Sequence, residues 1–199
     1  MNKKLVVLEG SSGAGKSTNI NIILNKRNDV DGINIKIGKL LENVRKTNFI
    51  DFSNTDYFLL LEKLKTIIFK DSPKKIVLFE RYYLSTLAHT YAMGIFNNDF
   101  EPYLKVLAWY HESINKTLLK PDAYIFIEAP MDLLESRVNQ RSEEVVNSVW
   151  IDKKYMQICE EYKKKFIENY ENDVKVFFVD GSKCIAEVND EISRLLKVL

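Results

Sequence analysis

The chain has 199 residues, of which 46% are hydrophobic and 29% charged, a composition typical of one packed globular domain and not of a disordered or fibrous polymer. Its formal net charge is only +1, so binding to a nucleic acid polymer would need a local basic patch, and we expect no such partner. Neither cysteine belongs to a CxxC motif or a Cys/His cluster, so no zinc site or disulfide framework is predicted. The apolar run starting at Leu5 stops at Glu9, and no other run approaches membrane-spanning length, so we expect a cytoplasmic protein without a membrane partner.

Short apolar runs alternate with helical patterns along the whole chain. Strands are predicted over residues 5–8, 33–37, 76–79, 123–127 and 174–179, and helices over 18–26, 57–69, 82–93, 103–118 and 155–170. Such alternation predicts an α/β fold with a parallel sheet and helices on both faces. The run at 33–37 alternates isoleucines with Asn34 and Lys36, so we place that strand near a sheet edge. Nothing indicates a second domain, and residues 1–199 are predicted to be one.

A glycine-rich segment between the first strand and the first helix satisfies the pattern GxxxxGK[ST] in full. Glycines let successive backbone N–H groups turn towards a phosphate, and the following helix adds the positive end of its dipole. Lys16 is then expected to reach the terminal phosphates, and the Ser17 hydroxyl to join the coordination of Mg²⁺. The predicted phosphate-binding residues are Gly10, Ser11, Ser12, Gly13, Ala14, Gly15, Lys16, Ser17 and Thr18.

A phosphate-binding loop alone fits switch GTPases, motor ATPases and small-molecule kinases. A GTPase would need a guanine-reading NKxD after a later strand, but the run Asn25-Lys26-Arg27-Asn28 lacks the Asp and lies on the first helix. The DxxG at residues 29–32 falls before the weak second strand, where we expect a plain turn.

The third predicted strand is followed directly by Glu80-Arg81-Tyr82. A carboxylate at the carboxyl end of a central strand faces the crevice where open α/β sheets bind ligands, so Glu80 is a candidate metal ligand beside Ser17. Arg81 is a candidate to hold an acceptor phosphate or to stabilise the transferred charge. At this point the sequence resembles the thymidylate kinase and deoxynucleoside kinase group, which carries Asp-Arg-Tyr or Glu-Arg-Ser here.

Later segments extend the resemblance over nearly the whole chain. Residues 120–130 look like a strand of the same family, and residues 176–182 look like its last strand with the loop beside the adenine. Arg137 and Arg141, four residues apart, resemble the arginines of the family's lid, placed at about residues 137–150. The resemblance implies the three-layer P-loop NTPase fold with a five-stranded parallel sheet in the order 2-3-1-4-5, a short lid, ATP and Mg²⁺ as cofactors, and a homodimer.

Two acceptors are compatible with the family pattern. A nucleoside monophosphate, in particular dTMP, is favoured by the chain length, by Glu80-Arg81-Tyr82 and by the motif at 179–182. An unphosphorylated nucleoside is favoured by the sequence of the phosphate-binding loop and by Arg141-x-Glu143-Glu144. The thymine-reading positions of the family are matched loosely by Phe58, Lys63 and Thr90, and Arg45 is a further candidate for the acceptor phosphate.

Family members usually carry an acid just beyond the second strand, whereas residues 36–40 offer only cations. A catalytically degenerate ATP-binding module is therefore an alternative, and an ATPase acting on protein or nucleic acid is a third. His89 and His111 lack a nearby nucleophile, and we interpret both as structural.

Overall fold

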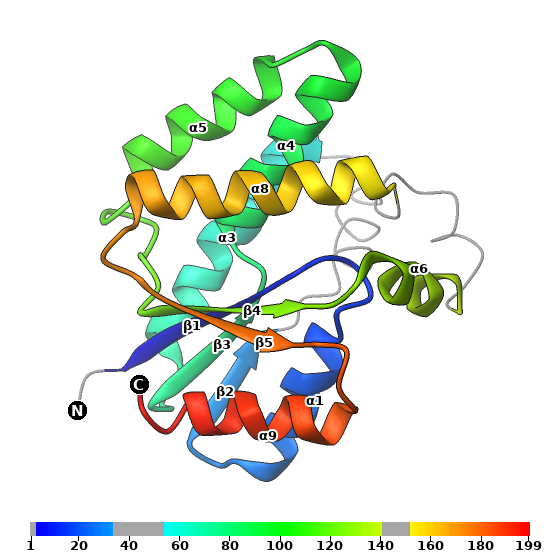
Figure 1. The fold of residues 1–199 in the computed structure, drawn as a ribbon. Coiled ribbons are helices and arrows are strands. Elements are labelled where there is room, and N and C mark those ends of the chain that lie inside the picture. Colours follow the sequence, from blue (N-terminus) through cyan, green and yellow to red (C-terminus); the bar gives the residue numbers. More distant parts are fainter. Residues whose placement is uncertain (1–2, 34–53, 141–151) are drawn as a thin grey trace, which may run out of the picture.

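The computed structural model describes residues 3–33, 54–140 and 152–199. Its centre is a sheet of five parallel strands in the order β2-β3-β1-β4-β5 (Figure 1). This confirms the predicted sheet and its strand order. The strands are β1 (Lys4–Glu9), β2 (Val30–Ile33), β3 (Ile76–Glu80), β4 (Ala123–Glu128) and β5 (Lys175–Asp180).

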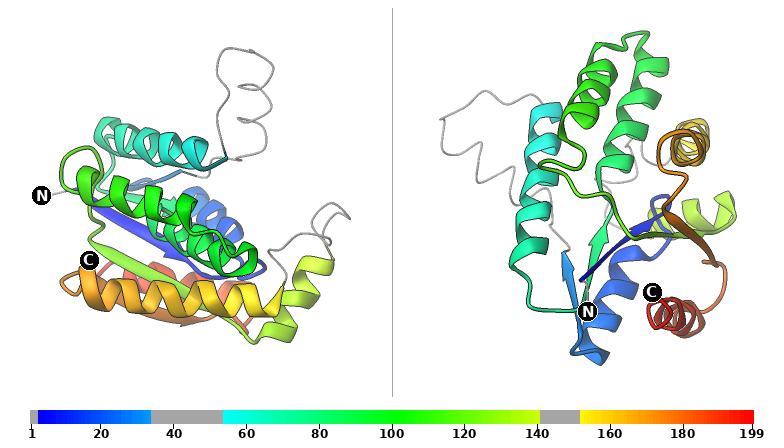
Figure 2. Two further views of the ribbon diagram at one scale, coloured as in Figure 1. Left: turned by 90° about the horizontal axis from the view of Figure 1, so that it is seen from above. Right: turned by 90° about the vertical axis from the view of Figure 1, so that its left-hand side faces the viewer.

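Helices cover both faces of the sheet (Figures 1 and 2). On one face lie α1 (Lys16–Lys26) and α9 (Ile185–Leu195). On the other lie α3 (Asn54–Asp71), α4 (Tyr83–Asn97), α5 (Glu101–Ser113) and α8 (Lys153–Tyr170). The short α6 (Met131–Asn139) follows the carboxyl end of β4.

Alternate residues of β1 pack into two separate cores, which explains its unbroken apolar run at residues 5–8. Leu5 and Val7 join the core formed with α4, α5 and α8. Val6 and Leu8 join the core formed with α1 and α9. Because successive strand side chains point to opposite faces, a strand covered on both sides must be apolar throughout.

Two sequence-based boundaries were wrong. Only Asp29 of the DxxG segment lies in a turn, because Val30–Ile33 pairs with β3 as the edge strand β2, three residues earlier than the predicted start. Gly32 suits that strand, since an added Cβ would lie 2.8 Å from a methyl group of Leu24 on α1. The position at the sheet edge agrees with the prediction, and residues 34–37 of the predicted strand lie outside the described residues.

The helix predicted over 103–118 ends instead at Ser113. Asn115 adopts a left-handed backbone with φ of 62°, a conformation that asparagine tolerates better than most residues. The Ser113 carbonyl then accepts hydrogen bonds from the amides of residues 116, 117 and 118, which closes a turn where the helix would have continued. Among the described residues, no helix is both long enough and apolar enough to cross a membrane.

Candidate active site

The glycine-rich loop joins β1 to α1 at the carboxyl edge of the sheet. Gly10, Gly13 and Gly15 all have positive φ, at 134°, 85° and 89°. Where residues with positive φ alternate with residues of negative φ, successive backbone N–H groups can converge on an anion. The loop also packs tightly, because a Cβ added to Gly13 would lie 2.7 Å from the Leu134 carbonyl oxygen on α6. The loop therefore has the backbone of a phosphate cradle.

Lys16 is the first residue of α1 and is almost fully buried, with 5% of its surface exposed. Its ammonium donates hydrogen bonds to the carbonyls of Gly10 and Ser11, at 2.8 and 2.9 Å. Burial, followed by the positive charge of Arg81, lowers its pKa well below the ordinary lysine value, which Glu80 partly opposes. An anion in the loop would stabilise the charged form, so this lysine is suited to bind phosphate.

Ser17 and Glu80 meet across the sheet edge. The Ser17 hydroxyl donates a 2.6 Å hydrogen bond to a carboxylate oxygen of Glu80 at the end of β3. The register of β3 against β1 brings them together, because Glu80 is opposite Leu8, two residues before the loop. Within the described residues no group of three His, Cys, Asp or Glu side chains is placed to hold a metal ion. One hydroxyl and one carboxylate suit Mg²⁺, which usually takes few protein ligands together with phosphates and water.

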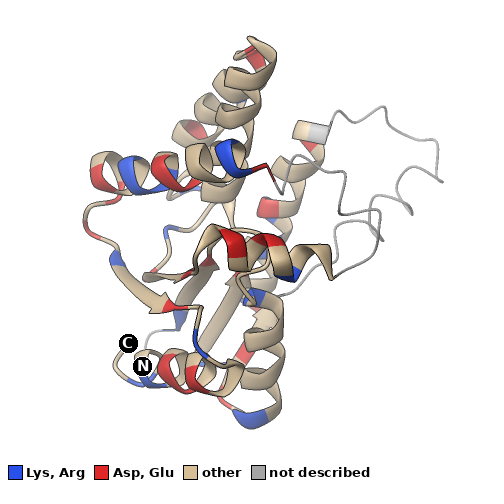
Figure 3. Cartoon of the chain, turned by 45° about the vertical axis from the view of Figure 1, so that its right-hand side comes forward, with Lys and Arg blue, Asp and Glu red and all other residues tan. Residues whose placement is uncertain are grey.

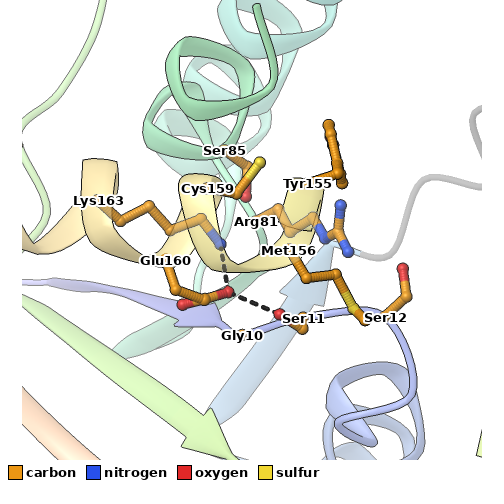
Figure 4. Close-up of a pocket in the computed structure, with 10 residues that line it drawn as sticks. All are labelled: Gly10, Ser11, Ser12, Arg81, Ser85, Tyr155, Met156, Cys159, Glu160 and Lys163. Atoms are coloured by element: carbon orange, nitrogen blue, oxygen red, sulfur yellow. Dashed lines mark hydrogen bonds and ion pairs between the residues drawn. The ribbon is translucent and has the colours of Figure 1, made fainter. Parts of the chain in front are cut away.

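Arg81 lies beside this pair and lines a pocket with the loop (Figure 4). Its amide donates to the Leu8 carbonyl at 3.0 Å, which fixes the backbone next to the end of β1. Figure 4 places its guanidinium between Tyr155 and Ser12. The structure thus brings together four predicted site residues: Lys16, Ser17, Glu80 and Arg81.

A buried charge network links the loop to α8 and was not recognised in the sequence. The Glu9 carboxylate accepts a hydrogen bond from Ser85 at 2.7 Å and lies 3.1 Å from the Lys163 ammonium. Lys163 also contacts Glu160, which accepts a hydrogen bond from the Ser11 hydroxyl at 3.0 Å (Figure 4). Burial lowers the pKa of Lys163, but the two carboxylates outweigh it and the net shift is upward.

One signal could have revealed part of this network. Glu9 directly follows the buried apolar run at residues 5–8, and a buried carboxylate there needs a cationic partner. Its partner Lys163 gave no comparable signal in the sequence. Acidic and basic residues alternate along α8 (Figure 3), a pattern typical of a helix face exposed to solvent.

The predicted acceptor residues on α3 and α4 lie in different surroundings. Phe58 is half-buried, with its ring 6.2 Å from the ring of His89. Thr90 is buried and donates its hydroxyl to the carbonyls of Thr86 and Leu87 on its own helix. Lys63 is exposed, on a surface lined also by residues of α5.

Of the two arginines predicted for the lid, Arg137 lies on α6 and donates to the Gly181 carbonyl at 2.8 Å, which joins α6 to the loop after β5. Arg141 lies outside the described residues, as do Arg45 and most of the predicted lid. The roles of these side chains stay predictions.

Comparison with known proteins identifies the family of the chain. The sequence model of the family described as thymidylate kinase matches residues 8–192. A probable thymidylate kinase of Methanococcus maripaludis is 25% identical over 202 residues, covering 95% of this chain and 92% of that protein. Probable thymidylate kinase 1 of Saccharolobus solfataricus is 22% identical, with 99% and 97% covered.

Solved structures share the fold. Deoxyadenosine kinase from M. mycoides, with dCMP and dCDP bound, superimposes with a TM-score of 0.73 at 19% identity, covering 98% of this chain and 100% of that one. Thymidylate kinase from Candida albicans gives a TM-score of 0.70 at 17% identity, with 99% and 92% covered. At such identities these likenesses establish the fold alone, whereas the family match spans the loop, the Glu80-Arg81 element and α8. The chain therefore belongs to the thymidylate kinase family of ATP-dependent nucleotide kinases.

Proposed function

We propose that this protein transfers the γ-phosphoryl group of ATP to a nucleoside monophosphate, with dTMP as the preferred acceptor. The observation that carries the proposal is that the hydrogen-bonded pair Ser17 and Glu80 lies with Lys16 and Arg81 at one edge of the sheet. The family match and the curated relatives favour dTMP over other acceptors.

The reaction breaks the bond between the γ-phosphorus of ATP and its bridging oxygen to the β-phosphate, and forms a bond from the γ-phosphorus to an oxygen of the acceptor phosphate. The loop amides and Lys16 hold the donor phosphates, and Arg81 balances charge between donor and acceptor. Ser17 and Glu80 would hold Mg²⁺ directly or through its waters, and the ion would neutralise the phosphate charge. Arg137 and Arg141, with the segment at about 137–150, form the lid in this proposal.

The test is an ADP-release assay on the purified protein, with thymidine and each deoxynucleoside monophosphate as acceptors in separate wells. We expect the highest kcat/KM with dTMP. A higher value with thymidine would support a deoxynucleoside kinase instead. Binding of ATP by calorimetry without any phosphorylated product would support a catalytically degenerate module.

Lys16→Ala tests the donor site. We expect kcat to fall by at least about 100-fold, because the only buried cation among the loop residues is removed. Lys26→Ala is the matched control, since Lys26 is exposed at the last turn of the same helix. Thermal unfolding verifies that both variants are folded, and a folded Lys16→Ala protein with full turnover would refute the assignment.

The same proposal includes a cytoplasmic homodimer. Apolar side chains exposed on α3 and α5, among them Leu60, Ile67 and Leu104, are compatible with a covered face. Light scattering at two protein concentrations would determine the oligomeric state.

A further inference from the structure

Arg81 has a backbone conformation that residues other than glycine seldom adopt. Its φ is 59°, in the left-handed region. The residue lies between the end of β3 and the start of α4, where the chain bends before the helix. A side chain with a Cβ is strained in this region, so surrounding contacts must impose the conformation.

Both backbone polar groups of Arg81 are held from outside its own segment. The amide donates to the Leu8 carbonyl at 3.0 Å, and the carbonyl accepts a hydrogen bond from the Lys65 ammonium at 3.1 Å. Lys65 lies on α3, 16 residues earlier in the chain, and only 4% of it is exposed. The buried Lys65 ammonium thus holds the peptide group between Arg81 and the next residue.

Glu62 holds that lysine. One carboxylate oxygen lies 3.0 Å from the Lys65 ammonium, which makes the two side chains an ion pair. The other carboxylate oxygen accepts a hydrogen bond of 3.4 Å from the Thr86 hydroxyl on α4. The two charged side chains are 3% and 5% exposed. Burial raises the pKa of Glu62, and Lys65 opposes this shift.

A buried ion pair is weak evidence for stability, because desolvation of two charges offsets their attraction. The contact of Lys65 with a strained backbone suggests another role. Resting on the function proposed above, we infer that the buried Glu62–Lys65 pair positions Arg81 for phosphoryl transfer. Lys65 binds the Arg81 carbonyl, Glu62 keeps Lys65 in place, and the left-handed backbone presents the guanidinium to the loop (Figure 4). Both are positioning residues that act through Arg81.

The test removes both charges together, so that neither is left buried without its partner. The variant is Glu62→Gln with Lys65→Met, and Lys70→Met, exposed on the same helix, is the matched control. With the acceptor of highest kcat/KM, we expect kcat to fall about 10- to 100-fold, because displaced catalytic groups cost factors of this size. The KM for ATP should change by less than about threefold, since the P-loop contacts remain.

A double-mutant cycle with Arg81→Ala separates positioning from a general structural effect. If the pair acts through Arg81, the charge-free variant should lower kcat by less than about threefold once Arg81 is gone. Equal losses with and without Arg81, or no loss in its presence, would overturn the inference.

Two further outcomes are distinguishable. Should the charge-free variant fail to fold, Lys65→Gln enters the same cycle, because its amide is uncharged and one bond shorter than the lysine side chain that donates to the Arg81 carbonyl. If the unaltered protein transfers phosphate to no acceptor, the proposed function fails and this inference fails with it. Equal losses in an active enzyme refute the inference alone.

Discussion

Glu171 is a buried carboxylate whose removal should destabilise the fold strongly. It caps the carboxyl end of α8 and is fully buried. Three tyrosine hydroxyls from three elements donate to it: Tyr83 at 2.5 Å, Tyr110 at 2.9 Å and Tyr124 at 2.7 Å. The pKa of each tyrosine is raised, first by burial and then by nearby charge and hydroxyl groups that include Glu171. The carboxylate therefore ties α4, α5 and β4 to the end of α8.

The expected cost of Glu171→Leu follows from the hydroxyls left behind. A buried hydroxyl without a partner costs about 1–3 kcal/mol. Tyr83 and Tyr124 can satisfy one another in part, because they interact already, so about two hydroxyls are stranded. Part of that cost is offset, since a carboxylate no longer has to be desolvated. We expect the free energy of unfolding to fall by about 3 kcal/mol.

Urea unfolding followed by tyrosine fluorescence or circular dichroism measures this change. Glu168→Leu, exposed one turn earlier on α8, is the control and should change the free energy of unfolding by less than about 0.5 kcal/mol. Tyr83→Phe should cost less in the Glu171→Leu background than in the unaltered protein, because its acceptor is already lost. A Glu171→Leu protein as stable as the control would refute the reasoning.

Two further predictions concern pH and the glycine loop. Burial, followed by the charge of Arg81, lowers the pKa of His89 to about 4, whereas an unfolded histidine titrates near 6.5. Between these values the unfolded state binds more protons, so stability is lost as the pH falls through this window, by about 2 kcal/mol between pH 7.5 and 5. His89→Gln should lack this contribution, and urea unfolding of both proteins at the two pH values measures the difference; identical pH dependence would contradict the shift. Gly13→Ala should lower the melting temperature and weaken ADP binding, because φ is 85° and the added Cβ would lie 2.7 Å from the Leu134 carbonyl oxygen. Calorimetric titration with ADP checks the second effect, and unchanged affinity would show that the loop tolerates a side chain there.

Local sequence determined the framework of this protein. The strand at residues 5–8 is apolar at every position because helices cover both faces of the sheet, and the sequence alone predicted that. The phosphate-binding loop is equally local, since glycine positions and the following lysine carry its chemistry within nine residues. The position of Glu80 and Arg81 beside the loop could be predicted, because the carboxyl ends of parallel strands meet at one edge.

Helix phase decided which charged residues of α3 face the interior. Five residues along a helix rotate a side chain by about 140°, so Lys63 cannot share the face of Phe58, whereas Glu62 at about 40° can. The sequence-based choice of Lys63 overlooked this rotation, and the structure shows Lys63 exposed and Glu62 buried. The pairing of Lys65 with the Arg81 carbonyl could not be predicted at all, because it depends on how α3 packs against the turn after β3.

Tertiary structure alone decided which partners the charged residues at the inner side of α8 contact. Glu160 and Lys163 lie on α8, whose charged pattern is that of a solvated surface, and Glu171 caps its carboxyl end, yet each contacts buried or half-buried partners. A charged residue can be buried wherever packing supplies opposite charge or hydrogen-bond donors. Apart from the contact between Glu160 and Lys163 within α8, those partners come from segments 47 to 154 residues away in the chain. The sequence by itself therefore determined the sheet and the phosphate loop, which depend on short-range patterns. The buried polar contacts around the candidate site were decided by the tertiary structure alone, because the residues that make them are far apart in the sequence and come together only on folding.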